Sequence, residues 1–203
     1  MTVNPRIVKA ALRKEARVKR AAAHAADPDP DVEHIAGLVL SRVHLLGGPY
    51  KAGHLIATYL SVGDEFPTKR LNGLLVEADQ ALCVPAWDKE KRCYVWSFLE
   101  GHLVEGPHGI LQPAEIFPVR KPEHIELAIV PGLAFSPDGA RLGHGAGIYD
   151  RLLNPLEETR FTTLVGLCYD AQLVPGIPLE DHDAFLPFIA TETRLIDVSH
   201  PED

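Results

Sequence analysis

Hydrophobic and polar side chains follow two spacings along this chain, one helical and one typical of strands. Residues 5–24 are rich in Ala, Lys and Arg and begin with a proline, which is favoured in the first turn of a helix. The sequence DPDPD at 27–31 ends this helix, and residues 32–46 carry apolar side chains at helical spacing. A third helix is predicted to have Pro67 at or near its first turn.

Short apolar segments alternate with these helices and are predicted to be strands: 54–61, 81–87, 92–99, 125–135 and 162–169. The run 125–135 is almost continuously apolar, as in a strand that is covered on both faces. Strands that alternate with helices predict an α/β sandwich. With 46% hydrophobic residues, a chain of 203 residues can bury a sizeable core, most simply as one domain.

Three further segments differ from this alternation of long helices and strands. Residues 100–123 are dense in glycine and proline and are expected to form an ordered loop with a short excursion. A short helix near residue 150 is expected to end near Asn154 and Pro155, because the residue before a proline disfavours helical backbone. Residues 198–203 are expected to be a loose tail on a single domain that spans 1–203.

The composition argues against several classes of protein, among them nucleic-acid-binding, secreted and membrane-spanning proteins. The formal net charge is −8, from 20 Lys and Arg against 28 Asp and Glu, which argues against a nucleic-acid surface but permits a local basic pocket. The N-terminal segment is too polar for a secretion signal, and no apolar run approaches the roughly 20 residues that span a bilayer. We therefore expect a cytoplasmic protein with no membrane partner. Cys83, Cys93 and Cys168 form no CxxC pair and are expected to be buried free thiols.

A cationic stripe runs along the first predicted helix. Lys9, Arg13 and Arg20 fall at near-helical spacings, so they share one face. Such a charge run is usually a solvated face, and the spacing alone favours that interpretation.

Residues 141–153, RLGHGAGIYDRLL, place three glycines at alternate positions before a helix. A dinucleotide fingerprint needs G-x-G-x-x-G, whereas the spacing here is Gly143-x-Gly145-x-Gly147. A Walker A loop needs GK[ST], which does not follow. The sequence therefore fits neither familiar nucleotide loop.

A different phosphate cradle is compatible with the same stretch. Alternating glycines before a helix let successive N–H groups turn toward one anion. Arg141 supplies a positive charge, and Asp150 is a candidate ligand for Mg²⁺. The alternative is a glycine-rich turn in which Asp150 only complements the helix dipole, and the stretch alone favours neither interpretation.

The stretch VPGLAFSPDGARLGHGAGIYDR at 130–151 resembles the signature of the 5-formyltetrahydrofolate cyclo-ligase family, also called 5,10-methenyltetrahydrofolate synthetases. Other pieces of the family pattern follow in the same order: K-x-x-L-R at 9–13, Y-L-S-x-x-D-E at 59–65, GI-x-x-P at 109–113, and the region 166–192. The resemblance runs from about residue 9 to residue 192. It implies a single-domain three-layer α/β sandwich, in which helices flank a parallel or mixed sheet.

The resemblance also implies an activity: the ATP- and Mg²⁺-dependent closure of 5-formyltetrahydrofolate to 5,10-methenyltetrahydrofolate, with release of ADP and phosphate. The formyl group on N5 is an amide, whose oxygen is a poor leaving group. Phosphorylation of that oxygen allows N10 to attack the carbon and phosphate to depart. Such a phosphoryl transfer asks the protein mainly for positioning and charge neutralisation.

The family pattern assigns expected roles to residues of this chain. Positions that match its ATP contacts are Lys9, Arg13, Arg141, Leu142, Gly143, His144, Gly145, Ala146, Gly147, Ile148 and Tyr149. Positions that match its folate contacts are Leu60, Glu65, His144, Gly145, Ala146, Gly147 and Ile148, and the magnesium positions are Asp150 and Asp183. The Glu65 carboxylate suits the paired donors of an amino-pyrimidinone ring. The expected partner is a reduced folate, and the chain is expected to act as a monomer or homodimer.

Some positions depart from the family pattern. Ile148 stands where the family carries an aromatic residue, Ala146 where glycine or lysine is common, and Ser136 where Asp is frequent. Ile148 and Ala146 favour a second hypothesis, a non-catalytic relative that binds a folate or a nucleotide, whereas the retained Asp150 and Asp183 argue against it. A third hypothesis, a dinucleotide oxidoreductase, is disfavoured by the glycine spacing.

Overall fold

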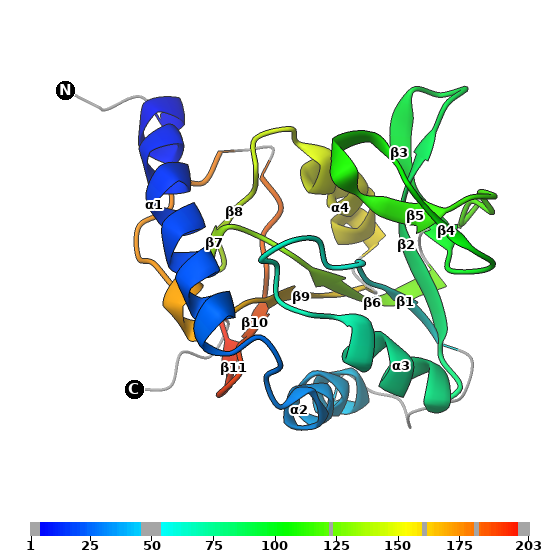
Figure 1. The fold of residues 1–203 in the computed structure, drawn as a ribbon, viewed down its shortest axis with the longest axis horizontal. Helices are drawn as coiled ribbons and strands as arrows, with labels where there is room; N and C mark the ends of the chain where they lie inside the picture. Colours follow the sequence, from blue (N-terminus) through cyan, green and yellow to red (C-terminus); the bar gives the residue numbers. More distant parts are fainter. Residues whose placement is uncertain (1–4, 46–53, 122–123, 160–161, 181–182, 199–203) are drawn as a thin grey trace.

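A computed structural model describes residues 5–45, 54–121, 124–159, 162–180 and 183–198 (Figure 1). One mixed sheet has the strand order β11-β10-β9-β6-β1-β2-β3. Its strands are β1 (Leu55–Ala57), β2 (Ala81–Asp88), β3 (Cys93–Phe98), β6 (Ile125–Val130), β9 (Thr163–Leu167), β10 (Phe188–Ala190) and β11 (Leu195–Asp197). The inner strands are parallel, and β3 and β11 pair antiparallel at the two edges.

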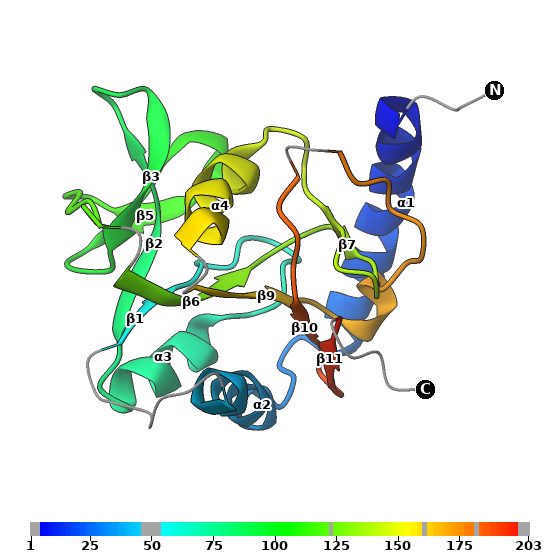
Figure 2. The ribbon, with the colours of Figure 1, turned by 180° about the vertical axis from the view of Figure 1, so that it is seen from behind.

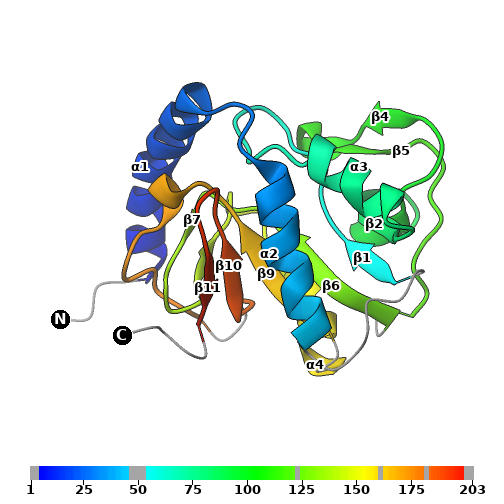
Figure 3. The ribbon, with the colours of Figure 1, turned by 90° about the horizontal axis from the view of Figure 1, so that it is seen from below.

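Helices cover both faces of this sheet. Helices α2 (Val32–Leu45) and α3 (Lys69–Glu77) lie on one face, and α4 (Ile148–Thr159) lies on the other (Figures 1 and 2). Helix α1 (Pro5–Ala26) runs beside the β10–β11 end of the sheet, as the view from below also shows (Figure 3). This arrangement confirms the predicted α/β sandwich of three layers. None of the described helices has the length and apolar character needed to cross a membrane.

Strand β6 explains the apolar run near residue 125. Leu127 and Ile129 belong to the core cluster under α2 and α3, whereas Ala128 and Val130 belong to the cluster under α4. Successive side chains of a strand point to opposite faces, so both faces of a central strand must be apolar.

The predicted strand 125–135 is too long. It breaks at Pro131, and Ala134–Phe135 instead forms β7, which pairs antiparallel with β8 (Arg141–Leu142) in a separate small sheet. The strand ends there because proline has no N–H group and cannot donate a hydrogen bond to the sheet. Likewise, only 55–57 of the predicted strand 54–61 form strand β1.

The predicted helix end at Asn154 is wrong, because α4 continues through Pro155 to Thr159. Leu152, Leu153 and Leu156 are buried on the same face of this helix. We infer that their packing outweighs the roughly 3 kcal/mol that proline costs inside a helix.

The segment 100–123 contains more regular secondary structure than the predicted loop. It forms a hairpin of β4 (Leu103–Glu105) and β5 (Leu111–Pro113), with a 3₁₀ turn at Pro107–Gly109 between them. At the other end of the chain, the sequence did not indicate β10. Of the predicted C-terminal tail, Val198 donates its N–H to the Pro187 carbonyl, and residues 199–203 lie outside the described residues.

Candidate functional site

A cavity of about 940 Å³ opens at the carboxyl ends of β1 and β6. Strand β2 pairs with β1 on one side and β6 pairs with it on the other, so the chain direction across the sheet reverses at this point. Ligands of open α/β sheets bind at such switch points. Helix α1, the β4–β5 hairpin and the loop before α4 complete the walls.

Every residue that the sequence assigned to the site lines this one cavity: Lys9, Arg13, Leu60, Glu65, Arg141, Leu142, Gly143, His144, Gly145, Ala146, Gly147, Ile148, Tyr149, Asp150 and Asp183. The fold thus brings together side chains from four segments that are far apart in the chain. Their individual roles stay predictions.

The glycine loop has the backbone that a close approach requires. Gly145 and Gly147 have φ values of 101° and 64°, a region that residues with a side chain rarely adopt. A Cβ atom at Gly143 would lie 2.9 Å from Nη1 of Arg141. The loop runs directly into α4, whose first N–H groups favour an anion.

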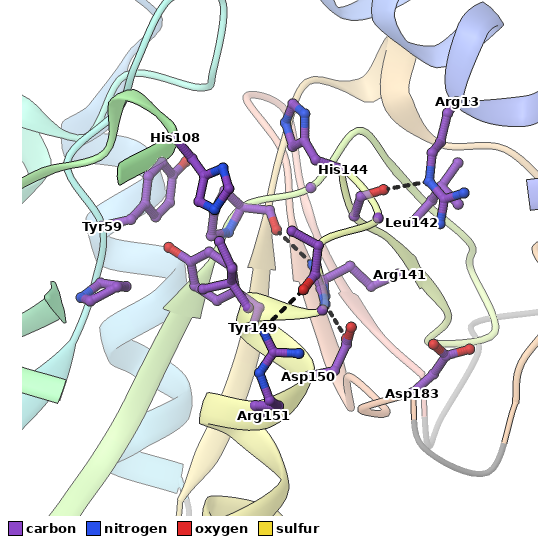
Figure 4. A pocket seen from close by; sticks show the side chains of 18 of the residues that line it. Arg13, Tyr59, His108, Arg141, Leu142, His144, Tyr149, Asp150, Arg151 and Asp183 are labelled. Atoms are coloured by element: carbon purple, nitrogen blue, oxygen red, sulfur yellow. Dashed lines mark hydrogen bonds and ion pairs between the residues drawn. The ribbon is translucent and has the colours of Figure 1, made fainter. Parts of the chain in front are cut away.

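Arg13 fastens this loop to α1. Its Nε atom donates to the Gly143 carbonyl at 2.9 Å (Figure 4). Arg151, from the first turn of α4, donates to the Ala146 carbonyl at 3.0 Å. Two cationic side chains therefore hold the loop from opposite sides, and both line the cavity.

Arg141 lies buried beneath the loop and is ion-paired with Asp150 (Figure 4). Its guanidinium carbon also lies 5.6 Å from the centre of the Tyr149 ring, within cation–π range. Its buried Nε atom has no hydrogen-bond partner within the described part of the chain. A buried cation with a spare donor at a cavity wall is suited to an anionic ligand.

A second cluster of charges joins α1 to the segment before β10. Lys9 is ion-paired with Asp183, and its Nζ lies 2.7 Å from Oε2 of Glu180. Burial lowers the pKa of the Lys9 ammonium, but the hydrogen bonds to Asp183 and Glu180 outweigh this, so its pKa is raised. Lys9 therefore stays charged beside the cavity.

The residues present fit a magnesium ion that is shared with phosphate. Asp150 and Asp183 provide the hard oxygen ligands that Mg²⁺ prefers. Within the described ranges, no group of three or more His, Cys, Asp or Glu residues could hold a metal by itself. Mg²⁺ is commonly bound by one or two carboxylates plus phosphates and water, which matches this donor set.

Another part of the cavity is built around Glu65. Its Oε2 atom accepts a hydrogen bond from the Val62 N–H at 3.0 Å, and its side chain is 17% exposed. Burial raises the pKa of the Glu65 carboxyl, and the Val62 N–H and the Arg20 charge only partly oppose this rise. Tyr59 lies in the wall nearby and donates its hydroxyl to the Phe66 carbonyl at 2.9 Å.

Several cavity residues were not assigned to the site from the sequence: Arg6, Arg20, His108, Arg151 and Glu180. For Arg20 a signal existed, because it shares the helical face of Lys9 and Arg13. For His108 the signal was its position just before the GI-x-x-P pattern. Arg151 and Glu180 lie within matched stretches, but nothing in those stretches distinguishes them from their neighbours.

The chain resembles known proteins in both sequence and fold. The model of the 5-formyltetrahydrofolate cyclo-ligase family matches residues 6–192. The 5-formyltetrahydrofolate cyclo-ligase of Escherichia coli (strain K12) is 28% identical over 151 residues, which are 72% of this chain and 82% of that protein. The protein of the same name from Mycolicibacterium smegmatis is 28% identical over 155 residues, 73% of this chain and 79% of its own.

Two solved structures share the fold. The 5,10-methenyltetrahydrofolate synthetase of Aquifex aeolicus superimposes with a TM-score of 0.70 over 97% of this chain and 95% of its own, at 24% identity. That of Mycoplasma pneumoniae has a TM-score of 0.60 over 91% and 98%, at 22% identity. The resemblance detected in the sequence is confirmed by the family match, and the chain belongs to the 5-formyltetrahydrofolate cyclo-ligase family.

Proposed function

We propose that this protein closes 5-formyltetrahydrofolate to 5,10-methenyltetrahydrofolate in a reaction that requires ATP and Mg²⁺. Family membership supports the folate conversion itself. The observation that carries the proposal is one continuous cavity, with a glycine loop and buried cations in one part and a largely buried carboxylate, Glu65, in another. The first part suits phosphates, and the second suits the donor edge of a pterin.

The reaction has two steps. The formyl oxygen attacks the γ-phosphorus of ATP, an O–P bond forms, and ADP leaves with the electrons of the broken bond. N10 then attacks the formyl carbon, the C–O bond breaks, phosphate departs, and the N10 proton is lost. The overall reaction is balanced in atoms and charge: 5-formyltetrahydrofolate and ATP give 5,10-methenyltetrahydrofolate, ADP and phosphate.

The residues serve this chemistry by position and charge. The N–H groups of Gly143 to Gly147 and the side chains of Lys9, Arg13 and Arg141 bind the phosphates. Glu65 orients the pterin, so that the formyl oxygen faces the transferred phosphoryl group. Asp150 and Asp183 would hold Mg²⁺, which when bound neutralises charge on the phosphate oxygens.

The ion pairs of the cavity are consistent with this assignment. Lys9 and Arg141 are each paired with a carboxylate that is also a candidate magnesium ligand. When phosphates and Mg²⁺ bind together, the two cationic side chains would pair with phosphate oxygens, and the two carboxylates would pair with Mg²⁺. No buried charge is left uncompensated by that exchange.

The fate of one oxygen atom tests the proposed steps. Substrate labelled with ¹⁸O in the formyl group should yield inorganic phosphate that carries the label, because the phosphorylated oxygen leaves with phosphorus. An unlabelled phosphate pool, formed alongside the methenyl product, would contradict phosphorylation of the formyl oxygen.

Replacing Arg13 with Ala should raise the KM for ATP about tenfold, in line with the loss of one charge-assisted hydrogen bond. The KM for 5-formyltetrahydrofolate should change less than twofold. Lys14→Ala is the matched control, because Lys14 is the next residue of α1 and is exposed. Steady-state kinetics with each substrate varied in turn measure both constants. An unchanged KM for ATP would contradict the role of Arg13 and would support the alternative, a charged helix face that only contacts solvent.

A further inference from the structure

The geometry points to Arg20 as a positioning residue that holds Glu65 for the folate, so that helix α1 serves both substrates. This inference rests on the proposed function and extends it to a residue that neither the family pattern nor the sequence assigned to the site.

Arg20 joins three segments around the cavity. Its Nη2 atom lies 2.6 Å from Oδ1 of Asp64, and its Nη1 atom donates to the Gly132 carbonyl at 3.3 Å. Nη1 also lies 3.9 Å from Oε1 of Glu65. One guanidinium thus connects α1, the turn at 62–65 and the corner after β6.

The contact with Glu65 works through charge. A separation of 3.9 Å is too long for a hydrogen bond but well within the range of an ion-pair attraction. The Val62 N–H fixes the other carboxylate oxygen, Oε2, at 3.0 Å. Glu65 is therefore held at one oxygen by the backbone and attracted at the other by Arg20, with its carboxylate at the cavity wall.

Burial makes this attraction necessary. A largely buried carboxylate tends to bind a proton, and a protonated Glu65 could not accept two hydrogen bonds from a pterin. Asp64, the adjacent carboxylate, adds a like charge that also disfavours ionised Glu65. Arg20 is a cation within ion-pair distance of Glu65 that opposes both effects.

A purely structural role explains the residue less well. Arg20 is 4% exposed, and its buried Nε atom has no partner within the described residues. A buried cation with an unused donor is costly, and apolar residues of similar size often replace such groups without loss of stability. An apolar side chain would pack α1 at this position, but it would not hold Glu65 ionised.

Distance along α1 separates Arg20 from the phosphate-binding residues. It lies 11 residues after Lys9, or about 16 Å along the helix axis at about 1.5 Å per residue. Arg13 contacts the glycine loop, whereas Arg20 contacts Asp64, Glu65 and Gly132. A change at Arg20 should therefore affect the folate more than the nucleotide.

The test compares Arg20→Met and Arg20→Lys with wild type and with the control Lys19→Met. Lys19 is the neighbouring residue, and its side chain is 44% exposed. Calorimetric titration with 5-formyltetrahydrofolate gives a Kd that does not depend on turnover. We expect Arg20→Met to raise this Kd about tenfold or more, Arg20→Lys to raise it less, and both to leave the KM for ATP within twofold.

A double-mutant cycle with Glu65→Gln separates positioning from packing. If Arg20 acts through Glu65, Arg20→Met should lower kcat/KM for 5-formyltetrahydrofolate much less in the Glu65→Gln background than in wild type. Equal losses in both backgrounds, or equal losses for both substrates, would overturn the inference. If Arg20→Met does not fold, the same double-mutant cycle is measured with Arg20→Lys and Glu65→Gln.

The outcomes distinguish this inference from the function on which it rests. If wild type shows no ATP-dependent turnover, the proposed function fails. If wild type turns over and Arg20→Met keeps its affinity for 5-formyltetrahydrofolate, the inference about Arg20 fails alone.

Discussion

Replacing Asp150 with Asn is expected to lower kcat about a thousandfold, which corresponds to roughly 4 kcal/mol of lost transition-state stabilisation. The amide keeps the shape of the side chain but removes its charge. Asp150 is ion-paired with Arg141 beneath the glycine loop, and it is the carboxylate nearest in sequence to that loop. Its loss should weaken both the arginine's orientation and the magnesium site.

The measurement is steady-state turnover over a range of Mg²⁺ concentrations, with thermal unfolding recorded in parallel. Asp138→Asn is the matched control, because Asp138 is exposed in the turn between β7 and β8. The control should retain full activity. A fully active Asp150→Asn protein would end the magnesium assignment at this position.

Replacing Glu65 with Gln should lower kcat/KM for 5-formyltetrahydrofolate about a hundredfold, because hydrogen bonds to a charged group contribute about 1.5–3 kcal/mol each. The amide nitrogen would point a donor at the donor edge of the pterin. The KM for ATP should stay within twofold. Glu77→Gln, at an exposed position of α3, is the control. Comparable losses for both substrates would show that Glu65 does not act on the folate specifically.

The pH dependence of folate binding follows from the same carboxylate. Burial raises the pKa of Glu65, so the group takes up a proton at a higher pH than an ordinary glutamate. Affinity for 5-formyltetrahydrofolate should therefore decline on acidification before ordinary glutamates titrate, and Glu65→Gln should lack this decline. Calorimetric titrations at several pH values measure it, and identical profiles for the two proteins would refute the role.

Folding stability should respond to Glu65 in the opposite sense. A carboxyl whose folded pKa is raised stabilises the fold most below its unfolded pKa, and this contribution is lost as pH rises through the folded pKa. The ionised form that binds folate is thus the less stable form of this site, as is common where a protein holds a functional charge away from water.

The layers of the fold could be predicted because they follow from periodicity. The alternation along β6 had to place Leu127 and Ala128 in different cores, and the helical face of Lys9 and Arg13 was visible in their spacing. The path of α4 through Pro155 could not be predicted, since it depends on the packing of Leu156 against the sheet. Local propensity and tertiary contacts conflict there, and the contacts prevail.

The residues of the site were found through the family pattern rather than through physics alone. No spacing rule indicates that Lys9 meets Asp183, which lies 174 residues away. Arg20 illustrates the reverse case, because its helical position was evident but its partners, Asp64 and Gly132, become neighbours only in the folded chain. Charges that pair over long sequence distances need the fold before their partners can be named.

The central claim is ATP-dependent ring closure, and one measurement tests it directly. Purified protein is mixed with 5-formyltetrahydrofolate, ATP and Mg²⁺, and the near-ultraviolet absorbance of 5,10-methenyltetrahydrofolate is followed, with ATP omitted in the control. We predict a steady rise in absorbance only when ATP is present. A flat trace, from protein that still binds 5-formyltetrahydrofolate, would contradict the claim and would favour a binding protein altered at Ala146 and Ile148.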